Sequence, residues 1–322
     1  MKGLINIRKF LVKHRYFSPR ATIMNTFFNQ ITQSLPDSKL LLFEVDPKKS
    51  RQWNANNVEP PTWTPVVSQC VSQAQIESPI YHNWCTAMHD MPRYSRKQWE
   101  YVYVLESLRQ QGLLTAGRKG LGFAVGTEPI SAVLATYDIQ VLATDLPSND
   151  ARADDWKKTG QHAGILQQLD ARGICDPANF ARHVQFRPVN MTEIPTNLYK
   201  QFDFVWSCCA FEHLGSLEAG LQFVTDSLQC LKPGGTAIHT TEYCVNSNDR
   251  TTTHSSTVLY RRQDLERLRD RLQLLGYKMD LNFHVGNDRW DHLVSLPPYH
   301  GSALKMYMSP FITTSIGLLI KS

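Results

Sequence analysis

Residues that could bind a ligand occur where short apolar stretches of the chain end. The first group is the glycine-rich segment Gly120-Leu-Gly-Phe-Ala-Val-Gly126, which precedes a helical pattern. Glycine at such a junction lets the backbone approach a ligand closely, and the N-terminus of the following helix favours negative groups. The spacing departs from the dinucleotide fingerprint GxGxxG, because the last gap is three residues rather than two. For this segment alone, a tight turn without a ligand is the alternative.

Asp145 is the second candidate. It follows the apolar stretch that ends at Thr144 and comes 19 residues after Gly126. A carboxylate at the end of a second strand can accept both hydroxyl protons of a ribose, whereas the alternative role is an ordinary helix cap. The glycine segment and the spaced aspartate together predict an adenosine-containing ligand. They do not choose between NAD and S-adenosylmethionine (AdoMet).

A third stretch distinguishes these ligands. The segment Phe202-Asp-Phe-Val-Trp-Ser-Cys-Cys-Ala-Phe-Glu-His213 is followed by a helical pattern and then by Leu231-Lys-Pro-Gly-Gly235. This arrangement resembles the class I AdoMet-dependent methyltransferases, over roughly residues 113–322. The closing TSIGLLIKS also looks like bacterial members associated with polysaccharide modification. An NAD-dependent oxidoreductase is disfavoured, since the fingerprint spacing fails and nothing downstream supports hydride transfer.

The resemblance implies a binding site for AdoMet, with S-adenosylhomocysteine as the product. Asp145 would hold the ribose hydroxyls, and Asn190 would replace the usual acidic contact to the adenine amino group. The family's usual acidic residue and its first and third glycines fall on Gly122, Ala124 and Glu128, so Glu128 is a candidate contact to the AdoMet amino group. The complete expected set is Gly122, Gly126, Glu128, Asp145, Asn190, Met191, Ser207 and Cys208.

The candidate catalytic residues lie beyond the predicted ends of two strands, where open α/β sheets bind ligands. Methyl transfer needs a nucleophile aligned with the sulfonium methyl, and a hydroxyl acceptor also benefits from a general base. His213 is the first candidate base and Glu242 the second; for His213 the alternative is a structural role in the loop. His239 is expected to pack inside a strand. Later loops offer His254, Asp291 and His292.

Metal binding is not expected. Some relatives bind a metal through an ExxEH pattern, but Cys209 stands at the position of its first glutamate. The predicted activity is O-methylation of a sugar, a glycan or another small molecule. The alternatives are methylation of nitrogen or of a macromolecule and, from a different class, a scaffold that binds AdoMet without catalysis.

Strand and helix patterns alternate after Gly112 and would position these residues. Helices are expected at 129–137, from 217 to 231 and at 263–275, and strands at 121–125, 140–144, 184–187, 202–208, 236–240, 279–285 and 312–320. Such alternation predicts a parallel α/β sheet with right-handed crossovers. We therefore expect a Rossmann-like, mostly parallel seven-stranded sheet with helices on both faces.

Residues 1–112 are predicted to form an N-terminal helical and irregular extension, which would cap residues 113–322 or bind substrate. Six prolines interrupt residues 36–80, where loops and short elements are expected, and residues 95–114 have a helical pattern. The first 17 residues are basic and predict a helix that packs on the domain or touches a membrane surface. The aromatic group Tyr81–Trp84, with His89 and Tyr94, would form a lid or anchor the extension.

Composition sets broad limits on the class of protein. The 322 residues are 42% hydrophobic and carry a net charge of +5, too small an excess to indicate nucleic acid. Seven cysteines without a CxxC pair favour a reduced, cytoplasmic setting. The apolar run 312–320 is too short to span a bilayer and is expected to be a buried strand. The oligomeric state is not indicated.

Overall fold

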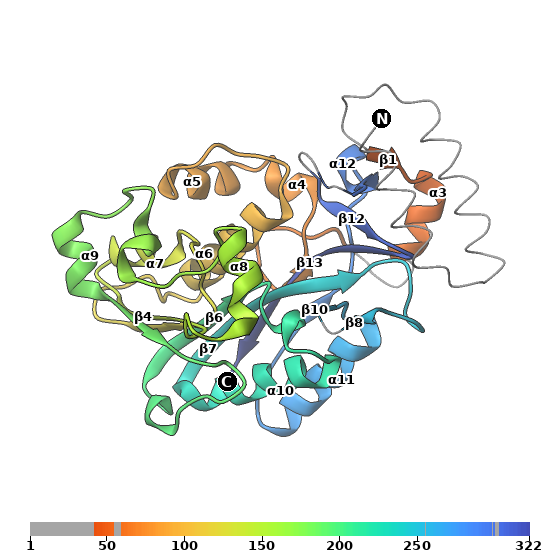
Figure 1. Ribbon diagram of the computed structural model, residues 1–322. Helices are drawn as coiled ribbons and strands as arrows, with labels where there is room; N and C mark the ends of the chain where they lie inside the picture. Colours follow the sequence, from red (N-terminus) through yellow and green to blue (C-terminus); the bar gives the residue numbers. More distant parts are fainter. Residues whose placement is uncertain (1–41, 55–58, 255, 298, 300–302) are drawn as a thin grey trace.

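The computed structural model describes residues 42–322, except 55–58, 255, 298 and 300–302 (Figure 1). The helix expected in the first 17 residues lies outside the described residues. The described chain forms a large mixed sheet with helices on both faces, which confirms the predicted α/β, Rossmann-like class.

Five adjacent parallel strands form the centre of the sheet. In spatial order they are β5 (Val184–Pro188), β4 (Gln140–Asp145), β3 (Lys119–Gly122), β6 (Phe202–Cys208) and β7 (Leu231–Cys244). The chain builds outward from β3 in one direction and then returns to build in the other. The carboxyl ends of β3 and β6 therefore flank a topological switch point, the usual place for a ligand in such sheets. The antiparallel β13 (Phe311–Lys321) follows β7 and confirms the buried strand expected at 312–320.

The predicted number of seven strands is wrong, because the sheet has eleven among the described residues. Four strands on the β13 side were not predicted: β2 (Ser68–Cys70), β12 (Lys305–Met308), β11 (Leu293–Ser295) and β1 (Leu42–Glu44). A fifth short strand, β10 (Leu281–Asn282), lies within the predicted strand 279–285. These strands have two to four residues, too few for a hydrophobic pattern to reveal them. The expected strand 279–285 shrinks to β10, since the Asn282 side chain accepts the backbone N–H of His284 and turns the chain. A separate hairpin pairs β8 (Thr253–His254) with β9 (Thr257–Val258).

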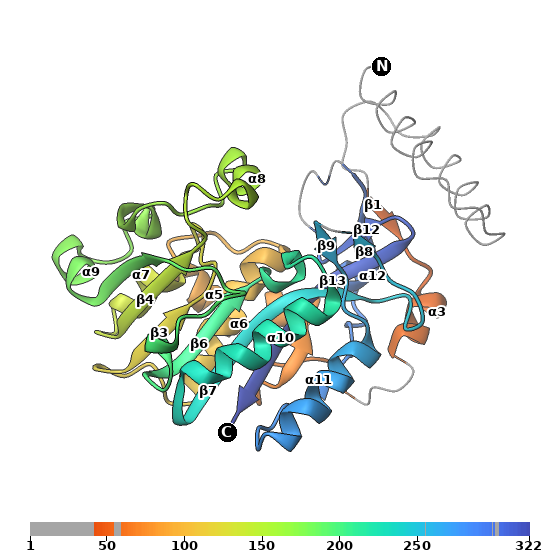
Figure 2. The same cartoon turned by 60° about the horizontal axis from the view of Figure 1, so that its bottom comes forward.

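Helices cover both faces of the sheet (Figure 2). One face carries α6 (Arg96–Gln110), α7 (Ile130–Ala135) and α9 (Pro177–His183), with α5 (Pro79–Ala87) packed on α6. The other face carries α10 (Leu217–Ser227) and α11 (Arg262–Leu274). The short helices are α3 (Pro47–Ser50), α4 (Gln73–Ile76), α8 (Asp154–Lys158) and α12 (Arg289–His292). The helix expected to reach residue 231 ends at Ser227, and a 3-10 turn, η6 (Leu228–Cys230), leads into β7.

The predicted extension contributes directly to the core of the fold. Strands β1 and β2 join the large sheet, and α6 packs across β13 and β7. Tyr103 of α6 approaches β13 so closely that a side chain in place of Gly317 would collide with its ring. Tyr81 donates a hydrogen bond to Gln98 at 2.9 Å, and Trp84 donates one to Glu106 at 2.9 Å. These two aromatic residues therefore anchor α5 to α6, which favours the anchoring interpretation over a lid.

In the described part of the chain, no helix combines the length and apolarity needed to cross a membrane.

Candidate active site

The glycine segment forms the turn from β3 toward α7, and its glycines serve different purposes. Gly126 has a φ of +52°, and a side chain there would collide with the carbonyl oxygen of Gln161. Gly122 lies within β3, where a side chain would collide with Trp206 and Val125. Gly126 thus allows the left-handed turn, whereas Gly122 allows the aromatic residue of β6 to pack beneath it. Ala124 has a φ of +48°, so the loop keeps a left-handed backbone where the resembled family carries glycine.

Asp145 ends β4 beside this loop. Its Oδ2 accepts the backbone N–H groups of Gly126 at 3.2 Å and Ala163 at 3.1 Å, and its Oδ1 accepts that of Leu146 at 2.8 Å. Burial raises the pKa of the carboxyl group, and these hydrogen bonds oppose the rise. Because each carboxylate oxygen has two lone pairs and three of the four are used in this way, Oδ1 can still accept one hydroxyl proton. Its position therefore suits the predicted ribose contact.

Glu128 is a buried carboxyl group just beyond the glycine loop. Its Oε1 accepts a hydrogen bond from Nε1 of Trp206 at 2.7 Å, and its side chain also bonds to that of Cys208. Burial raises its pKa to about 8, although the bond from Trp206 and the charge of Lys97 oppose this. A cationic ligand group placed here would favour the ionised form. The geometry is thus compatible with a contact to an ammonium group.

The other predicted cofactor residues are placed differently. Oδ1 of Asn190 accepts two hydrogen bonds from Thr192, so this oxygen already stabilises the turn after β5. Met191 is packed in the core on the α10 side of the sheet. The hydroxyl of Ser207 bonds to Nδ1 of His239 at 2.8 Å inside the protein, so its side chain is engaged with a core residue. His239 is fully buried, as predicted, and burial lowers its pKa to about 3.

His213 lies at the end of the 3-10 turn η5 (Phe211–His213), directly after β6. Its Nδ1 is 2.6 Å from the carbonyl oxygen of Ser256, and the edge of the Trp156 ring packs against the imidazole. Since a carbonyl can only accept, Nδ1 carries a proton. In the neutral ring Nε2 then has the free lone pair, at 3.8 Å from Oε1 of Glu212. This is the arrangement that a histidine base requires.

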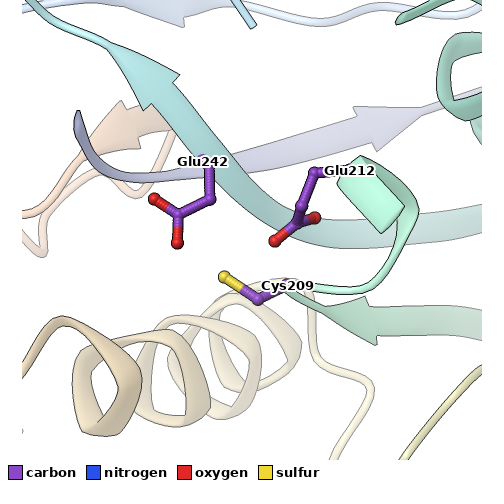
Figure 3. A group of neighbouring side chains, drawn as sticks. All are labelled: Cys209, Glu212 and Glu242. Atoms are coloured by element: carbon purple, nitrogen blue, oxygen red, sulfur yellow. The ribbon is translucent and has the colours of Figure 1, made fainter. Parts of the chain in front are cut away.

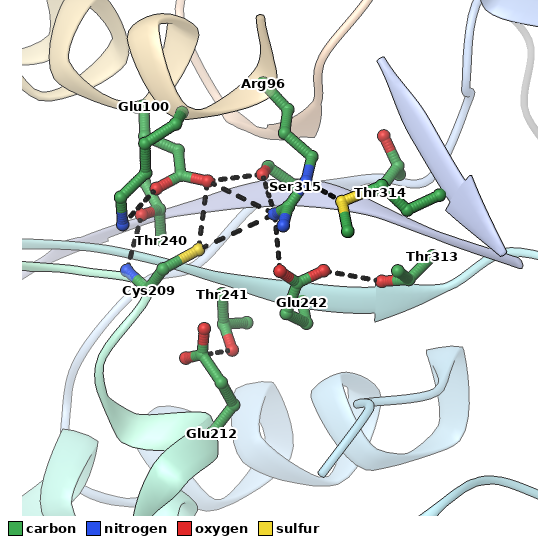
Figure 4. A network of polar contacts seen from close by, with 12 residues as sticks. Arg96, Glu100, Cys209, Glu212, Thr240, Thr241, Glu242, Thr313, Thr314 and Ser315 are labelled. Atoms are coloured by element: carbon green, nitrogen blue, oxygen red, sulfur yellow. Dashed lines mark hydrogen bonds and ion pairs between the residues drawn. The ribbon is translucent and has the colours of Figure 1, made fainter. Parts of the chain in front are cut away.

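Glu242 lies near the end of β7 in a charged network that no local sequence pattern predicted (Figure 4). Arg96 from the start of α6 forms an ion pair with its Oε1, and Thr313 donates to its Oε2 at 2.7 Å. Arg96 also lies 3.7 Å from the fully buried Glu100, which accepts a hydrogen bond from Ser315. Both carboxylate oxygens of Glu242 therefore have partners, which suits an orienting role better than proton abstraction.

Cys209 and Glu212 complete this group from the β6 side (Figure 3). Cys209 has a φ of +44° and donates its backbone N–H to the carbonyl oxygen of Thr240 at 3.0 Å. Glu212 is fully buried; Thr241 donates to its Oε2 at 3.0 Å. One donor atom from each of Cys209, Glu212 and Glu242 lies within 4.8 Å of the others. Non-glycine residues with positive φ often occur at functional sites.

The residues missed by the sequence analysis are Arg96, Lys97 and Glu100. They lie on a helix that was attributed to the extension by its apolar periodicity. Glu100 was the available signal, since it occupies a helix position that faces the sheet together with apolar residues. A carboxylate in such a place needs a partner. Asp291 and His292 instead lie in α12, where they bond to backbone groups, and His254 lies in the hairpin strand β8.

Comparisons with known proteins agree with this geometry. The family model of the methyltransferase domain matches residues 121–239, from β3 to β7. No curated protein matches the chain.

Among solved structures, the chain is similar to a putative sarcosine dimethylglycine methyltransferase from Galdieria sulphuraria, with 14% identity, 69% of this chain and 83% of that chain covered, and a TM-score of 0.43. It is also similar to a putative methyltransferase from Bacillus halodurans, with 15% identity, coverage of 67% and 97%, and a TM-score of 0.42.

The family match includes both the glycine loop with Asp145 and the segment from β6 to β7. It coincides with the parallel strands β3, β4, β5, β6 and β7, whose order creates the switch point. Over residues 121–239 the chain therefore matches a methyltransferase domain, in agreement with the AdoMet-dependent methyltransferase that the sequence predicts.

Proposed function

We propose that the protein transfers the methyl group of AdoMet to a hydroxyl oxygen of a polar small molecule, such as a sugar or a glycan. The cofactor would lie between the glycine loop and Asp145, with its amino group near Glu128. The acceptor would lie beyond the ends of β6 and β7, close to His213. Seven free thiols and the absence of a disulfide among them are compatible with a cytoplasmic location.

The observation that carries this proposal is the tautomer of His213. The Ser256 carbonyl holds the proton on Nδ1, which leaves Nε2 able to accept one. In the reaction the hydroxyl oxygen attacks the methyl carbon, the carbon–sulfur bond breaks with its electron pair going to sulfur, and the hydroxyl proton goes to Nε2. An alcohol needs such a base much more than a neutral amine does.

A polar acceptor is supported by the chemistry around Glu242. Carboxylates, a guanidinium group and the hydroxyls of Thr313 and Ser315 gather at the ends of the strands. Groups of this kind fix the orientation of a ligand that has many hydroxyls. Methylation of nitrogen is the second candidate, because Oε1 of the buried Glu212 has no hydrogen-bond partner and could accept one from an amine.

The test compares acceptor panels with radiolabelled AdoMet, using monosaccharides and nucleotide sugars in one set and primary amines in the other. We expect label in the hydroxyl set, and a loss of about 10²- to 10⁴-fold in turnover for His213→Gln. AdoMet affinity should be unchanged in that variant. Transfer only to amines, with His213→Gln nearly as active as the wild type, would overturn the proposal.

A further inference from the structure

The cluster of Cys209, Glu212 and Glu242 lies where strands β6 and β7 end, and it contains more acceptors than the surrounding protein satisfies. The ligand atoms come from three separate elements and point toward one another (Figure 3). Two of the three side chains are almost completely buried. Glu242 is paired with Arg96 and the Cys209 thiol donates a hydrogen bond to Glu100 at 2.9 Å, so Glu212 is the member of the cluster that lacks a partner for one of its atoms.

A second observation, independent of how close the three residues lie, concerns the carboxylate of Glu212. Its Oε1 is buried and accepts no hydrogen bond, although its Oε2 accepts one from Thr241. Nearly all buried carboxylate oxygens in proteins have a partner, because leaving one without a partner costs about 1–3 kcal/mol or more. Nε2 of His213 lies 3.8 Å from this oxygen, which is beyond hydrogen-bond distance. The unpartnered oxygen therefore indicates a ligand that is positively charged or donates a proton.

The charges around the cluster favour a cation. Three buried carboxylates, those of Glu100, Glu212 and Glu242, face two basic side chains, Arg96 and Lys97. Arg96 approaches from α6, whereas Glu212 approaches from η5 at the other end of the cluster (Figure 4). The guanidinium group therefore compensates Glu242 and leaves Glu212 uncompensated. A divalent cation that displaces the proton of the Cys209 thiol would balance the negative charge of the thiolate and of Glu212.

We propose that Cys209, Glu212 and Glu242 bind a divalent transition-metal ion of the zinc or cobalt type. A thiolate with two carboxylates selects such an ion over magnesium or calcium, which prefer oxygen ligands alone. Ligand atoms around one zinc ion are roughly 3.4–3.7 Å apart, so the present separations close with small side-chain rotations. Binding releases the thiol proton to solvent. Three protein ligands leave one position open for the acceptor hydroxyl; this role, unlike the site itself, rests on the proposed function.

The experiment titrates the chelator-treated full chain with cobalt chloride. We expect one Co²⁺ per chain and the near-ultraviolet absorption that marks a bond between cobalt and a thiolate. Cys209→Ser should lose this absorption, and Glu212→Gln should bind Co²⁺ at least tenfold more weakly while its circular dichroism stays native. Cys175→Ser is the matched control, because Cys175 is a buried cysteine before α9 and should leave the absorption intact.

Three outcomes would overturn the metal site: no stoichiometric Co²⁺, the same absorption in Cys209→Ser, or unchanged affinity in Glu212→Gln. If Cys209→Ser fails to fold, the Co²⁺ affinity of Glu212→Gln alone tests the metal site. The binding of AdoMet by the metal-free wild type is measured in parallel. AdoMet binding without cobalt binding would refute the metal site and leave the methyltransferase intact, whereas cobalt binding without AdoMet binding would refute the proposed function instead.

Discussion

The cofactor side and the acceptor side of the candidate site are built in opposite ways. The cofactor side uses residues that follow one another closely along the chain, from Gly122 to Asp145, and it relies on backbone groups. The acceptor side gathers charged side chains from α6, β6, β7 and β13, with Arg96 and Ser315 separated by 219 positions. Turns tolerate little change in conformation, whereas a charge network can be rearranged by single substitutions. We therefore expect the cofactor side to tolerate fewer substitutions than the acceptor side.

The largest expected effect of a substitution on stability concerns Glu128, at the junction of the two sides. Its pKa is about 8 in the folded protein and near 4.5 when unfolded. The folded state therefore keeps a proton that the unfolded state loses, and this contribution to stability disappears as the pH rises from about 4.5 to 8. The loss is roughly 4 kcal/mol over that range.

Urea unfolding of the wild type and of Glu128→Gln between pH 5 and pH 8 measures this difference. We expect the stability of the wild type to fall relative to the variant by about 1.4 kcal/mol per pH unit. If the free energies of unfolding of the two proteins changed with pH in parallel, Glu128 would not be a buried acid with a raised pKa.

On the acceptor side, Arg96→Met should destabilise the fold by about 3 kcal/mol, because three buried carboxylates would face Lys97 alone. The double variant Arg96→Met/Glu242→Leu should recover much of this loss, since it removes one of those carboxylates. Chemical denaturation gives both values. The control Arg271→Met breaks an exposed pair with Glu218 and should cost at most about 1 kcal/mol. If Arg96→Met and Arg271→Met lowered the free energy of unfolding equally, the network around Arg96 would carry no buried charge.

On the cofactor side, Asp145→Asn should weaken AdoMet binding by about 10- to 100-fold, as expected for the loss of hydrogen bonds to a charged group. Isothermal titration calorimetry measures this directly. Asp226→Asn in α10 provides a control at a half-buried position outside the predicted site. Similar AdoMet affinities for Asp145→Asn and the control would remove Asp145 from the cofactor site.

The smallest effect is expected at Ala124, whose φ of +48° suits glycine. Ala124→Gly should stabilise the protein by at most about 1 kcal/mol, since the relief of strain is partly offset by the entropy of glycine. Ala219→Gly inside α10 is the opposite case and should destabilise by a similar amount. Thermal unfolding compares the two, and a destabilised Ala124→Gly would mean that the left-handed loop carries no strain.

The sequence predicted best what depends on local pattern. The apolar stretches at β3, β4, β6 and β13 were long enough to locate the centre of the sheet. The predicted pairing of the glycine loop with Asp145 corresponds to a hydrogen bond from Gly126 to this residue. Strand β2, with the sequence Ser-Gln-Cys, has no apolar pattern, so its pairing with β13 could not be foreseen.

The acceptor side was only partly predictable for the same physical reason. His213 and Glu242 could be singled out because each follows a predicted strand. Arg96 and Glu100 join them only because α6 packs across β13 and β7, a long-range contact that the periodicity of the helix does not specify. The side chain of Ser207 was expected at the ligand, but it bonds to His239 in the core.

The most direct test of the central claim is the thermal unfolding of the wild-type protein with and without saturating AdoMet. Ligand at 100 times its dissociation constant should stabilise the fold by about 2.7 kcal/mol and raise the melting temperature by several degrees. S-adenosylhomocysteine should raise the melting temperature in the same way. The Asp145→Asn variant should need a higher concentration of either compound for the same rise. An unchanged melting temperature of the wild type with both compounds would contradict the account.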